Sequence, residues 1–447
     1  MTLHADHIRS QLSVGPMAAA KLRAKLGVSQ PTMSRALAEL GGDIVRFGAA
    51  RSIHYTLRDH ARGLPDIPIY RVNAEGAIRQ LGLLIPVRPD GFVMRQADGT
   101  TFHSDGLPWW LSDMRPQGYL GRAYVARYGT ELGLPDRLKD WTDTHVLRAL
   151  LVHGHDSVGN ILISDHARDR FLAAPIPEPI SLSNKAESYA LAALAAARGG
   201  TPGSSAGGEQ PKFIAYAMTT EGERHVLVKF SEWENSPVSE RWRDLLLAEH
   251  LALAVLREAG VPAAKTQIIN HGGQRFLEVE RFDRIGSLGR CALHSLSALD
   301  AEFAGFGTGS WPEIARSLAD ARQIDSEAVA GAALLWAFGT LIGNSDMHNG
   351  NLSFITDREP PYSIAPAYDM TPMAFAPRSG GGLPDTLSEA KIHGSVPNET
   401  WRRAAVLSRS FLSQVKDSDG FSRRFEPCIA ALEHHIGVAS AKINRLE

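Results

Sequence analysis

The sequence predicts an α+β protein in which a small basic domain precedes a β-rich region and a longer region that ends in helices. Its 447 residues are too many for one ordinary domain, so about two or three domains are expected. The hydrophobic fraction of 44% is typical of a globular protein with substantial cores. Short strand-like runs dominate residues 66–180, whereas helical periodicity dominates after residue 310.

The first domain, residues 1–62, carries an excess of positive charge. It contains nine Lys and Arg against four Asp and Glu, a net charge of +5, which leaves −7 for the rest of the chain. A basic domain on an acidic body indicates that the domain binds a polyanion.

Residues 1–62 also show the pattern of a helix-turn-helix followed by a wing. Ser29 is a natural N-cap, and Pro31 fits the first turn of the helix that follows it. The expected helices are 7–12, 18–26 and 30–40, and the expected wing strands are 44–47 and 53–57. The side chains expected to contact duplex DNA are Gln30, Thr32, Ser34 and Arg35 on the third helix and Arg46 and Arg51 on the wing. This pattern resembles the winged helix-turn-helix of bacterial regulators, and a domain used only for dimerisation is the alternative.

The region between residues 61 and 198 carries fewer signals. Residues 61–70, which contain Pro65 and Pro68, are expected to form a linker to a β-rich N-terminal subdomain, residues 66–180. The expected elements of this subdomain are strands at 91–94, 100–102 and 160–163 and a helix at 142–151. An extended connector, 173–179, then leads to an Ala-rich helix, 186–198, in the third region, 181–447.

Several classes of protein are disfavoured. Cys291 and Cys428 are far apart in sequence and have no C-x-x-C spacing, so neither a disulfide framework nor a zinc site is expected. The N-terminus lacks the apolar stretch of a signal peptide. The longest uncharged, mainly apolar run, 328–343, has sixteen residues and is too short to span a membrane. We therefore expect a soluble, cytoplasmic protein with no membrane partner.

A loop rich in small residues precedes a predicted hairpin. Residues 203–212 read G-S-S-A-G-G-E-Q-P-K, and such a run lets backbone N–H groups approach phosphates closely. Strands expected at 213–217 and 225–230 follow, and Lys229 near the end of the second could reach ATP phosphates. Glu249 lies on the inward side of the next helix, 241–259, and Lys229 is its expected partner because a buried Glu needs one.

Residues 343–354, G-N-S-D-M-H-N-G-N-L-S-F, form a polar loop between an apolar helix and a strand. Phosphoryl transfer needs one carboxylate that orients an acceptor hydroxyl, here Asp346, and an Asn oxygen that holds a metal, here Asn351. Asp369, in A-Y-D, supplies the second carboxylate eighteen residues later. The alternative is an Asx-rich turn without catalytic function.

The order of these motifs resembles one family. The motifs S-S-A-G-G-E-Q-P-K, L-V-K, E-R-F-D-R, N-S-D-M-H-N-G-N and A-Y-D together are similar to the HipA family of bacterial serine/threonine kinases, toxins of type II toxin–antitoxin systems. The resemblance implies a two-lobed protein-kinase-like fold with a β-rich N-terminal subdomain, ATP and Mg²⁺ as cofactors, and transfer to a protein Ser or Thr. It also implies an aminoacyl-tRNA synthetase as the kind of substrate, and an antitoxin partner.

The resemblance assigns roles to individual residues. Asp346 matches the catalytic base, and Asn351 and Asp369 match the metal ligands. The nucleotide-binding set is Gly207, Gly208, Lys229, Glu280, Phe282, His348 and Tyr368. Autophosphorylation of a loop serine, which ejects the loop and inactivates the enzyme, would fall on Ser205 or on the adjacent Ser204.

Two features depart from the family. The DNA-binding head is fused to the kinase, although a separate antitoxin usually binds DNA, and Glu209 adds an acidic residue to the phosphate loop. The alternatives are therefore a DNA-binding transcriptional regulator whose kinase-like body senses nucleotide, and a small-molecule kinase with the same core.

Overall fold

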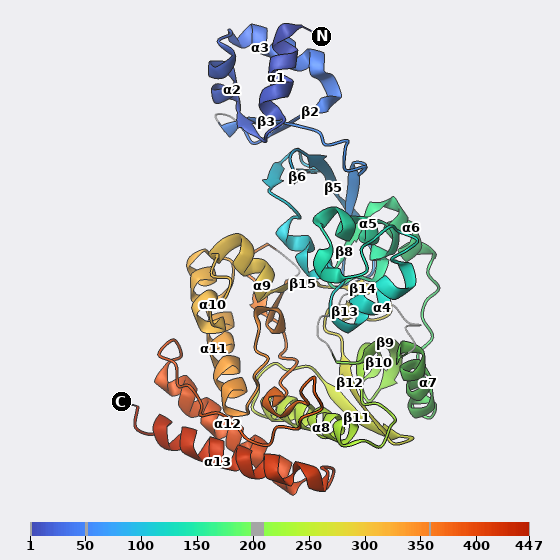
Figure 1. Cartoon of the computed structure of the whole chain (residues 1–447), viewed down its shortest axis with the longest axis vertical. Coiled ribbons are helices and arrows are strands. Elements are labelled where there is room, and N and C mark those ends of the chain that lie inside the picture. Colours follow the sequence, from blue (N-terminus) through green and yellow to red (C-terminus); the bar gives the residue numbers. More distant parts are fainter. Residues whose placement is uncertain (1, 50–51, 198–209, 357–358, 447) are drawn as a thin grey trace.

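The computed structural model describes residues 2–49, 52–197, 210–356 and 359–446. Along its longest axis, the N-terminal head lies at one end, the middle domain follows, and the kinase-like region forms the other end (Figure 1). Five residues with expected roles lie outside the described residues: Arg51, Ser204, Ser205, Gly207 and Gly208. No helix among the described residues is long and apolar enough to cross a membrane.

The head consists of three helices and a three-stranded antiparallel sheet in the order β1-β3-β2. The elements are α1 (Leu3–Leu12), β1 (Met17–Ala18), α2 (Ala19–Leu26), α3 (Gln30–Leu40), β2 (Ile44–Phe47) and β3 (His54–Leu57). Helix α3 has the predicted bounds, and the Ser29 side chain accepts a hydrogen bond from Thr32 N, as expected of an N-cap. Helix α1 begins four residues earlier than predicted because Thr2 is its N-cap: the Thr2 side chain accepts a hydrogen bond from Ala5 N.

The head is attached directly to the middle domain. Val45 of β2 is buried in one cluster with Ile85, Val87 and Val93 of the middle domain. The guanidinium of Arg62 donates to the backbone oxygens of Val87 and Gly91 at 3.0 and 2.7 Å. The predicted linker at 61–70 is therefore too long. Residues 61–66 form no helix or strand, but a strand begins at Ile67 and contains Pro68.

The middle domain contains a five-stranded antiparallel sheet in the order β7-β6-β5-β4-β8. Its strands are β4 (Ile67–Val72), β5 (Ile78–Val87), β6 (Gly91–Gln96), β7 (Thr101–Ser104) and β8 (Ile161–Ile163). Its helices are α4 (Gly118–Tyr128), α5 (Asp143–His153) and α6 (Ser164–Ala173). Only α5 was predicted, so the description of this part as β-rich omits two helices. Helix α6 is mostly polar and buries only Ala167 and Phe171, so its sequence lacks the repeating hydrophobic pattern from which an amphipathic helix is predicted.

The first lobe of the third region is a four-stranded sheet, β11-β12-β10-β9, with helices on both sides. Helix α7 packs its buried Tyr189 against Phe213 and Phe276 on one face. On the other face, Leu246 of α8 packs against Leu277 and Val279. The elements are α7 (Lys185–Ala197), β9 (Lys212–Thr219), β10 (Gly222–Phe230), α8 (Pro237–Glu258), β11 (Thr266–His271) and β12 (Gln274–Glu280).

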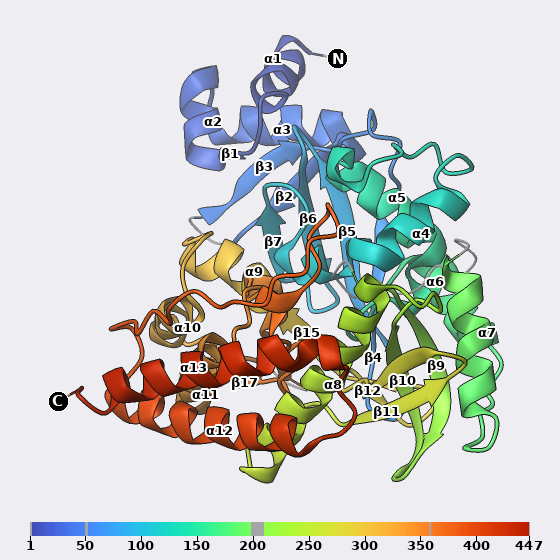
Figure 2. The same cartoon turned by 60° about the horizontal axis from the view of Figure 1, so that its bottom comes forward.

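The second lobe is mainly helical. Helix α11 (Ser326–Leu341) is apolar all round and is surrounded by α10 (Trp311–Asp320), α12 (Asn398–Asp417) and α13 (Glu426–Ile443). Figure 2 shows α12 and α13 side by side across the end of this lobe. The remaining elements are the hairpin β13 (Arg284–Ile285) and β14 (Gly289–Arg290), the short helix α9 (Leu296–Leu299), and the sheet of β15 (Ala292–Ser295), β16 (Ser353–Thr356) and β17 (Ser363–Ile364).

Candidate active site

A cleft with a volume of about 1120 Å³ lies where the two lobes meet. It is large enough for a nucleotide together with part of an acceptor. Its charged lining comes from both lobes and includes Lys212, Lys229, Glu280, Asp346 and Asp369. The middle domain adds Asp113 and Gln117 to the wall.

Lys229 is the central cation of the cleft. Its Nζ lies 2.7 Å from Glu249 Oε1 and 2.8 Å from Oε2, and it also contacts Asp369 Oδ1. The predicted Lys229–Glu249 pair is thus confirmed. Thr371 Oγ1 donates to Glu249 Oε2 at 2.8 Å, which fixes the carboxylate. Burial alone would lower the pKa of Lys229, but Asp369 and Glu249 outweigh burial and raise it, so the side chain stays charged.

Side-chain to backbone hydrogen bonds hold the loop that follows α11. Asn344 Nδ2 donates to Asp369 O at 3.1 Å, and Asn344 Oδ1 accepts from Asp346 N at 3.0 Å. Asn351 Nδ2 donates to Asp346 O at 2.8 Å. These bonds hold Asp346 beside Asp369 and leave its carboxylate exposed to the cleft.

Asn351 and Asp369 form a donor set that fits Mg²⁺. Because the Asn351 amide nitrogen donates to the loop backbone, the atom left to bind a cation is its Oδ1. Burial would raise the pKa of Asp369, but Lys229 and Lys212 outweigh burial and lower it, so its carboxylate is ionised. Among the described residues, no group of three or more His, Cys, Asp and Glu could hold a metal. A pair of oxygen donors suits Mg²⁺ that is bound together with substrate phosphates.

The segment after β12 also lines the cleft. The Phe282 and Tyr368 rings lie 5.8 Å apart, and both residues line the cleft. The Tyr368 hydroxyl donates to Gly350 O at 2.8 Å, and the residue is half-buried. Glu280 lies 3.7 Å from Arg224 in an ion pair. His348 Nδ1 accepts from Gly350 N at 3.0 Å, so its Nε2 is the nitrogen free to face a ligand.

Lys212 and Asp113 are among the residues of the cleft that were not predicted as part of the site. Lys212 lies directly opposite Lys229 in the β9–β10 register, and its charge helps to lower the pKa of Asp369. The G-G-E-Q-P-K motif contained the signal for it. Asp113 accepts hydrogen bonds from Ser295 N and Oγ at 2.7 and 2.6 Å, across 182 residues of sequence, and no sequence signal pointed to it.

The described residues that are expected to contact DNA belong to α3 and β2 of the head, and none of them lines the cleft. Figure 1 shows these two elements at the end of the molecule away from α11 and α13. Gln30, Ser34 and Arg35 are exposed on α3, and Arg46 is exposed on β2. Thr32 is half-buried, and its hydroxyl shares a hydrogen bond of 2.9 Å with Ser29, so it mainly serves the helix cap.

Comparison with known proteins places the chain in a family. Residues 204–435 match the model of the HipA-like C-terminal domain, and residues 64–172 match that of the YjjJ-like toxin, middle domain. Toxin YjjJ of Escherichia coli (strain K12) is 39% identical over 434 residues, which cover 97% of each chain. The chain belongs to the family of HipA-like and YjjJ-like toxins. The resemblance seen in the sequence is confirmed.

One solved structure supports the fold of this HipA-like toxin. A chain of the Shewanella oneidensis MR-1 complex of HipA, HipB and operator DNA superposes with a TM-score of 0.50 and 17% identity, covering 85% of this chain and 97% of that one. This likeness confirms the predicted two-lobed, protein-kinase-like fold. The proinflammatory kinase CtkA of Helicobacter pylori is a weaker match, with a TM-score of 0.38 and 14% identity, covering 53% of this chain and 93% of that one.

Proposed function

We propose that this HipA-like toxin is an ATP-dependent protein serine/threonine kinase. The observation that carries the proposal is the convergence of Lys229, Asp346 and Asp369 in one cleft, with Asn351 beside them. The lysine supplies positive charge for phosphates, and the loop carboxylate faces the space where an acceptor would lie. Positioning and charge stabilisation of this kind are the main requirements of phosphoryl transfer.

The residues divide the chemistry among them. Lys229 and Lys212 bind phosphate oxygens, and the rings of Phe282 and Tyr368 hold the base. Asn351 and Asp369 would hold Mg²⁺, which neutralises charge on the phosphates. Asp346 orients the substrate hydroxyl and accepts its proton. The hydroxyl oxygen forms a new bond to the γ-phosphorus while the bond from that phosphorus to the β–γ bridging oxygen breaks, and ADP leaves.

The substrate that we propose is a protein of translation, in particular an aminoacyl-tRNA synthetase. The likeness of this chain to the HipA family supports this choice. The exposure of Asp346 also supports it, because a Ser or Thr side chain of a protein could reach this carboxylate in the cleft. The HipA structure also contains HipB and operator DNA, so we include an antitoxin and DNA among the proposed partners. The same likeness supports regulation by autophosphorylation at Ser205 or Ser204, which lie outside the described residues.

A second candidate function is DNA binding by residues 1–62 as a winged helix-turn-helix domain. The exposed polar face of α3 (Gln30, Ser34 and Arg35) favours it. If the kinase-like body only sensed nucleotide, the chain would be a transcriptional regulator. The presence of Lys229, Asp346, Asn351 and Asp369 together argues against that alternative, because a sensor does not need all four.

Incubation with γ-labelled ATP, Mg²⁺ and a whole lysate distinguishes these alternatives. We expect a labelled protein band with the wild type and a loss of label by a factor of about 10²–10⁴ with Asp346→Asn, which keeps the shape of the side chain but lacks the base. Intact-mass measurement of the same two proteins counts the phosphates on each, and peptide mapping is expected to place a phosphate on Ser204 or Ser205 of the wild type alone. A labelled metabolite would indicate a small-molecule kinase. No label, or equal label with Asp346→Asn, would refute the proposed function.

A further inference from the structure

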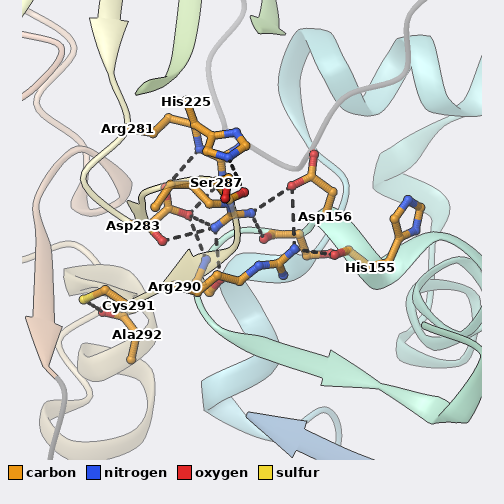
Figure 3. Close-up of polar contacts among 12 residues, drawn as sticks. His155, Asp156, His225, Arg281, Asp283, Ser287, Arg290, Cys291 and Ala292 are labelled. Carbon is orange, nitrogen blue, oxygen red and sulfur yellow. Dashed lines mark hydrogen bonds and ion pairs between the residues drawn. The ribbon is translucent and has the colours of Figure 1, made fainter. Parts of the chain in front are cut away.

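A cluster of buried charges lies where the middle domain meets the segment that links the two lobes (Figure 3). Arg281, Arg284 and Arg290 supply three guanidinium groups, and Asp156 and Asp283 supply two carboxylates. Except for Asp156, whose side chain is 41% exposed, every one of these side chains is at most 9% exposed. The sequence motif E-R-F-D-R contributes three of the five residues, but the proposed chemistry uses none of them.

Arg284 binds the middle-domain loop 155–159 through several atoms. Its Nη2 donates to Asp156 Oδ1 at 3.0 Å and to Ser157 O at 2.7 Å. Its Nη1 donates to Gly159 O at 3.1 Å. A guanidinium offers this fixed fork of donors, whereas the single ammonium of a lysine could not reach all three acceptors in the same geometry.

The same guanidinium also holds the segment that links the lobes. Arg284 Nη1 donates to Asp283 Oδ2 at 2.7 Å, and Gly159 N donates to the same carboxylate at 3.0 Å. Arg281 adds bonds of 3.0 and 2.9 Å to Asp283. Burial would raise the pKa of Asp283, but Arg281 and Arg284 outweigh burial and keep it ionised. The carboxylate is therefore a shared anchor for both parts of the chain.

The anchor lies at the wall of the cleft. Arg281, Phe282 and Asp283 line the cleft, and so does Val158 from the bound loop. Arg281 N donates to His225 O at 2.9 Å, which ties the segment to β10 on its other side. A shift of loop 155–159 would therefore be transmitted to Phe282, the residue that we place against the nucleotide base.

We propose that Arg284 is a positioning residue that uses the middle-domain loop 155–159 to fix segment 280–283 and thereby the nucleotide base. The inference rests on the proposed kinase function, because that function places the base beside Phe282. It gives the middle domain a part in ATP binding, although most of the catalytic groups lie on the two lobes. Loss of the anchor affects binding of the base equally in the ground state and the transition state, so KM for ATP rises while kcat changes little.

The experiment compares four proteins: the wild type, Arg284→Met, Asp156→Asn and a matched control, Asp165→Asn. Asp165 forms an Arg–Asp pair with Arg168 at 2.7 Å in the same domain but away from the cleft. We expect kcat/KM for ATP to fall by about 10²-fold in Arg284→Met, mainly through KM. Asp156→Asn should show a smaller rise in KM, and Asp165→Asn should match the wild type.

If Arg284→Met fails to fold, Asp156→Asn decides the test. The Asp156 side chain is partly exposed, and in this variant Asp283 still forms its ion pairs with Arg281 and Arg284, so we expect the protein to fold. Equal KM values in Asp156→Asn and Asp165→Asn would overturn the inference, as would a fall in kcat at unchanged KM. If the wild type transfers no phosphate, the proposed function fails. The stabilisation of each protein by ATP, measured as a shift in Tm, then tests the inference by itself. A shift in Asp156→Asn equal to that of the control would overturn it.

Discussion

Asp346 and Asp369, two of the carboxylates that line the cleft, have opposite electrostatic environments. Asp369 lies against Lys229 and near Lys212, which lower its pKa despite burial. Asp346 is oriented by the loop backbone, and partial burial together with the neighbouring Asp369 raises its pKa above the ordinary 3.8, although His348 acts in the other direction. When the environments of two carboxyl groups shift their pKa values in opposite directions, the two groups are suited to different roles. Asp369 remains an anion suited to a cation, and Asp346 is the better proton acceptor.

This separation predicts an acid limb in the pH dependence of kcat/KM. Asp346 must be ionised to accept the hydroxyl proton, so activity falls as pH falls through its pKa. Because that pKa is raised, activity should be lost at a higher pH than the ordinary value of 3.8 would give. The profile should be measured with saturating Mg²⁺ and a peptide or protein acceptor, with folding followed in parallel by fluorescence. An acid limb that persists in the residual activity of Asp346→Asn would assign it to another group.

At the scale of elements, α7 is attached to the sheet of the first lobe by a buried polar contact. Lys185 Nζ lies 2.8 Å from Glu278 Oε2 on β12, and the Tyr189 hydroxyl also donates to Glu278. Glu278 pairs with Val228 in the strand register, so it lies on the face opposite Lys229. One face of the sheet therefore holds Lys229 and the other holds α7.

Removing one partner of this buried pair should destabilise the first lobe. Lys185→Met leaves the Glu278 charge without its cation, and we expect a loss of about 3–5 kcal/mol in the free energy of unfolding. Urea denaturation followed by tryptophan fluorescence measures it. The control is Lys265→Met, which removes the half-exposed pair with Glu221 and should change the transition little. An unchanged midpoint in Lys185→Met would show that this pair does not stabilise the first lobe.

The sequence predicted the elements and contacts that have local signals. Ser29 and Pro31 located α3, and the inward position of Glu249 on its helix predicted its contact with Lys229. The sequence did not predict contacts between residues that are far apart along the chain. Asp156 meets Arg284 across 128 residues, and no pattern in one sequence indicates that contact. The two loop serines and the two loop glycines lie outside the described residues, so their roles stay predictions.

At the scale of the whole molecule, the head, the middle domain and the cleft are joined by buried contacts. Val45 packs against Val87 and Val93, and Arg62 binds Val87 O at 3.0 Å, at the first junction. Arg284 makes the second junction with loop 155–159. These contacts join the head, which carries α3, to the middle domain, and loop 155–159 joins the middle domain to the wall of the cleft. Figure 2 shows α3 above the strands of the middle domain. DNA bound by the head would accordingly set the orientation of the kinase body.

Because the α3 face is far from the catalytic groups, DNA binding and phosphoryl transfer should be separable by mutation. Binding of a mixed-sequence duplex by the full chain should weaken steeply with salt, since Lys and Arg release condensed counterions. Arg35→Glu should abolish binding and leave phosphorylation unchanged, and Arg35→Ala should reduce the salt slope by about one. Lys139→Glu, an exposed change of equal charge in the middle domain, is the control. Fluorescence anisotropy with labelled duplex measures all four proteins. Equal binding by Arg35→Glu and Lys139→Glu, or no binding by the wild type at low salt, would show that α3 does not contact DNA and that the charge of the head serves another partner.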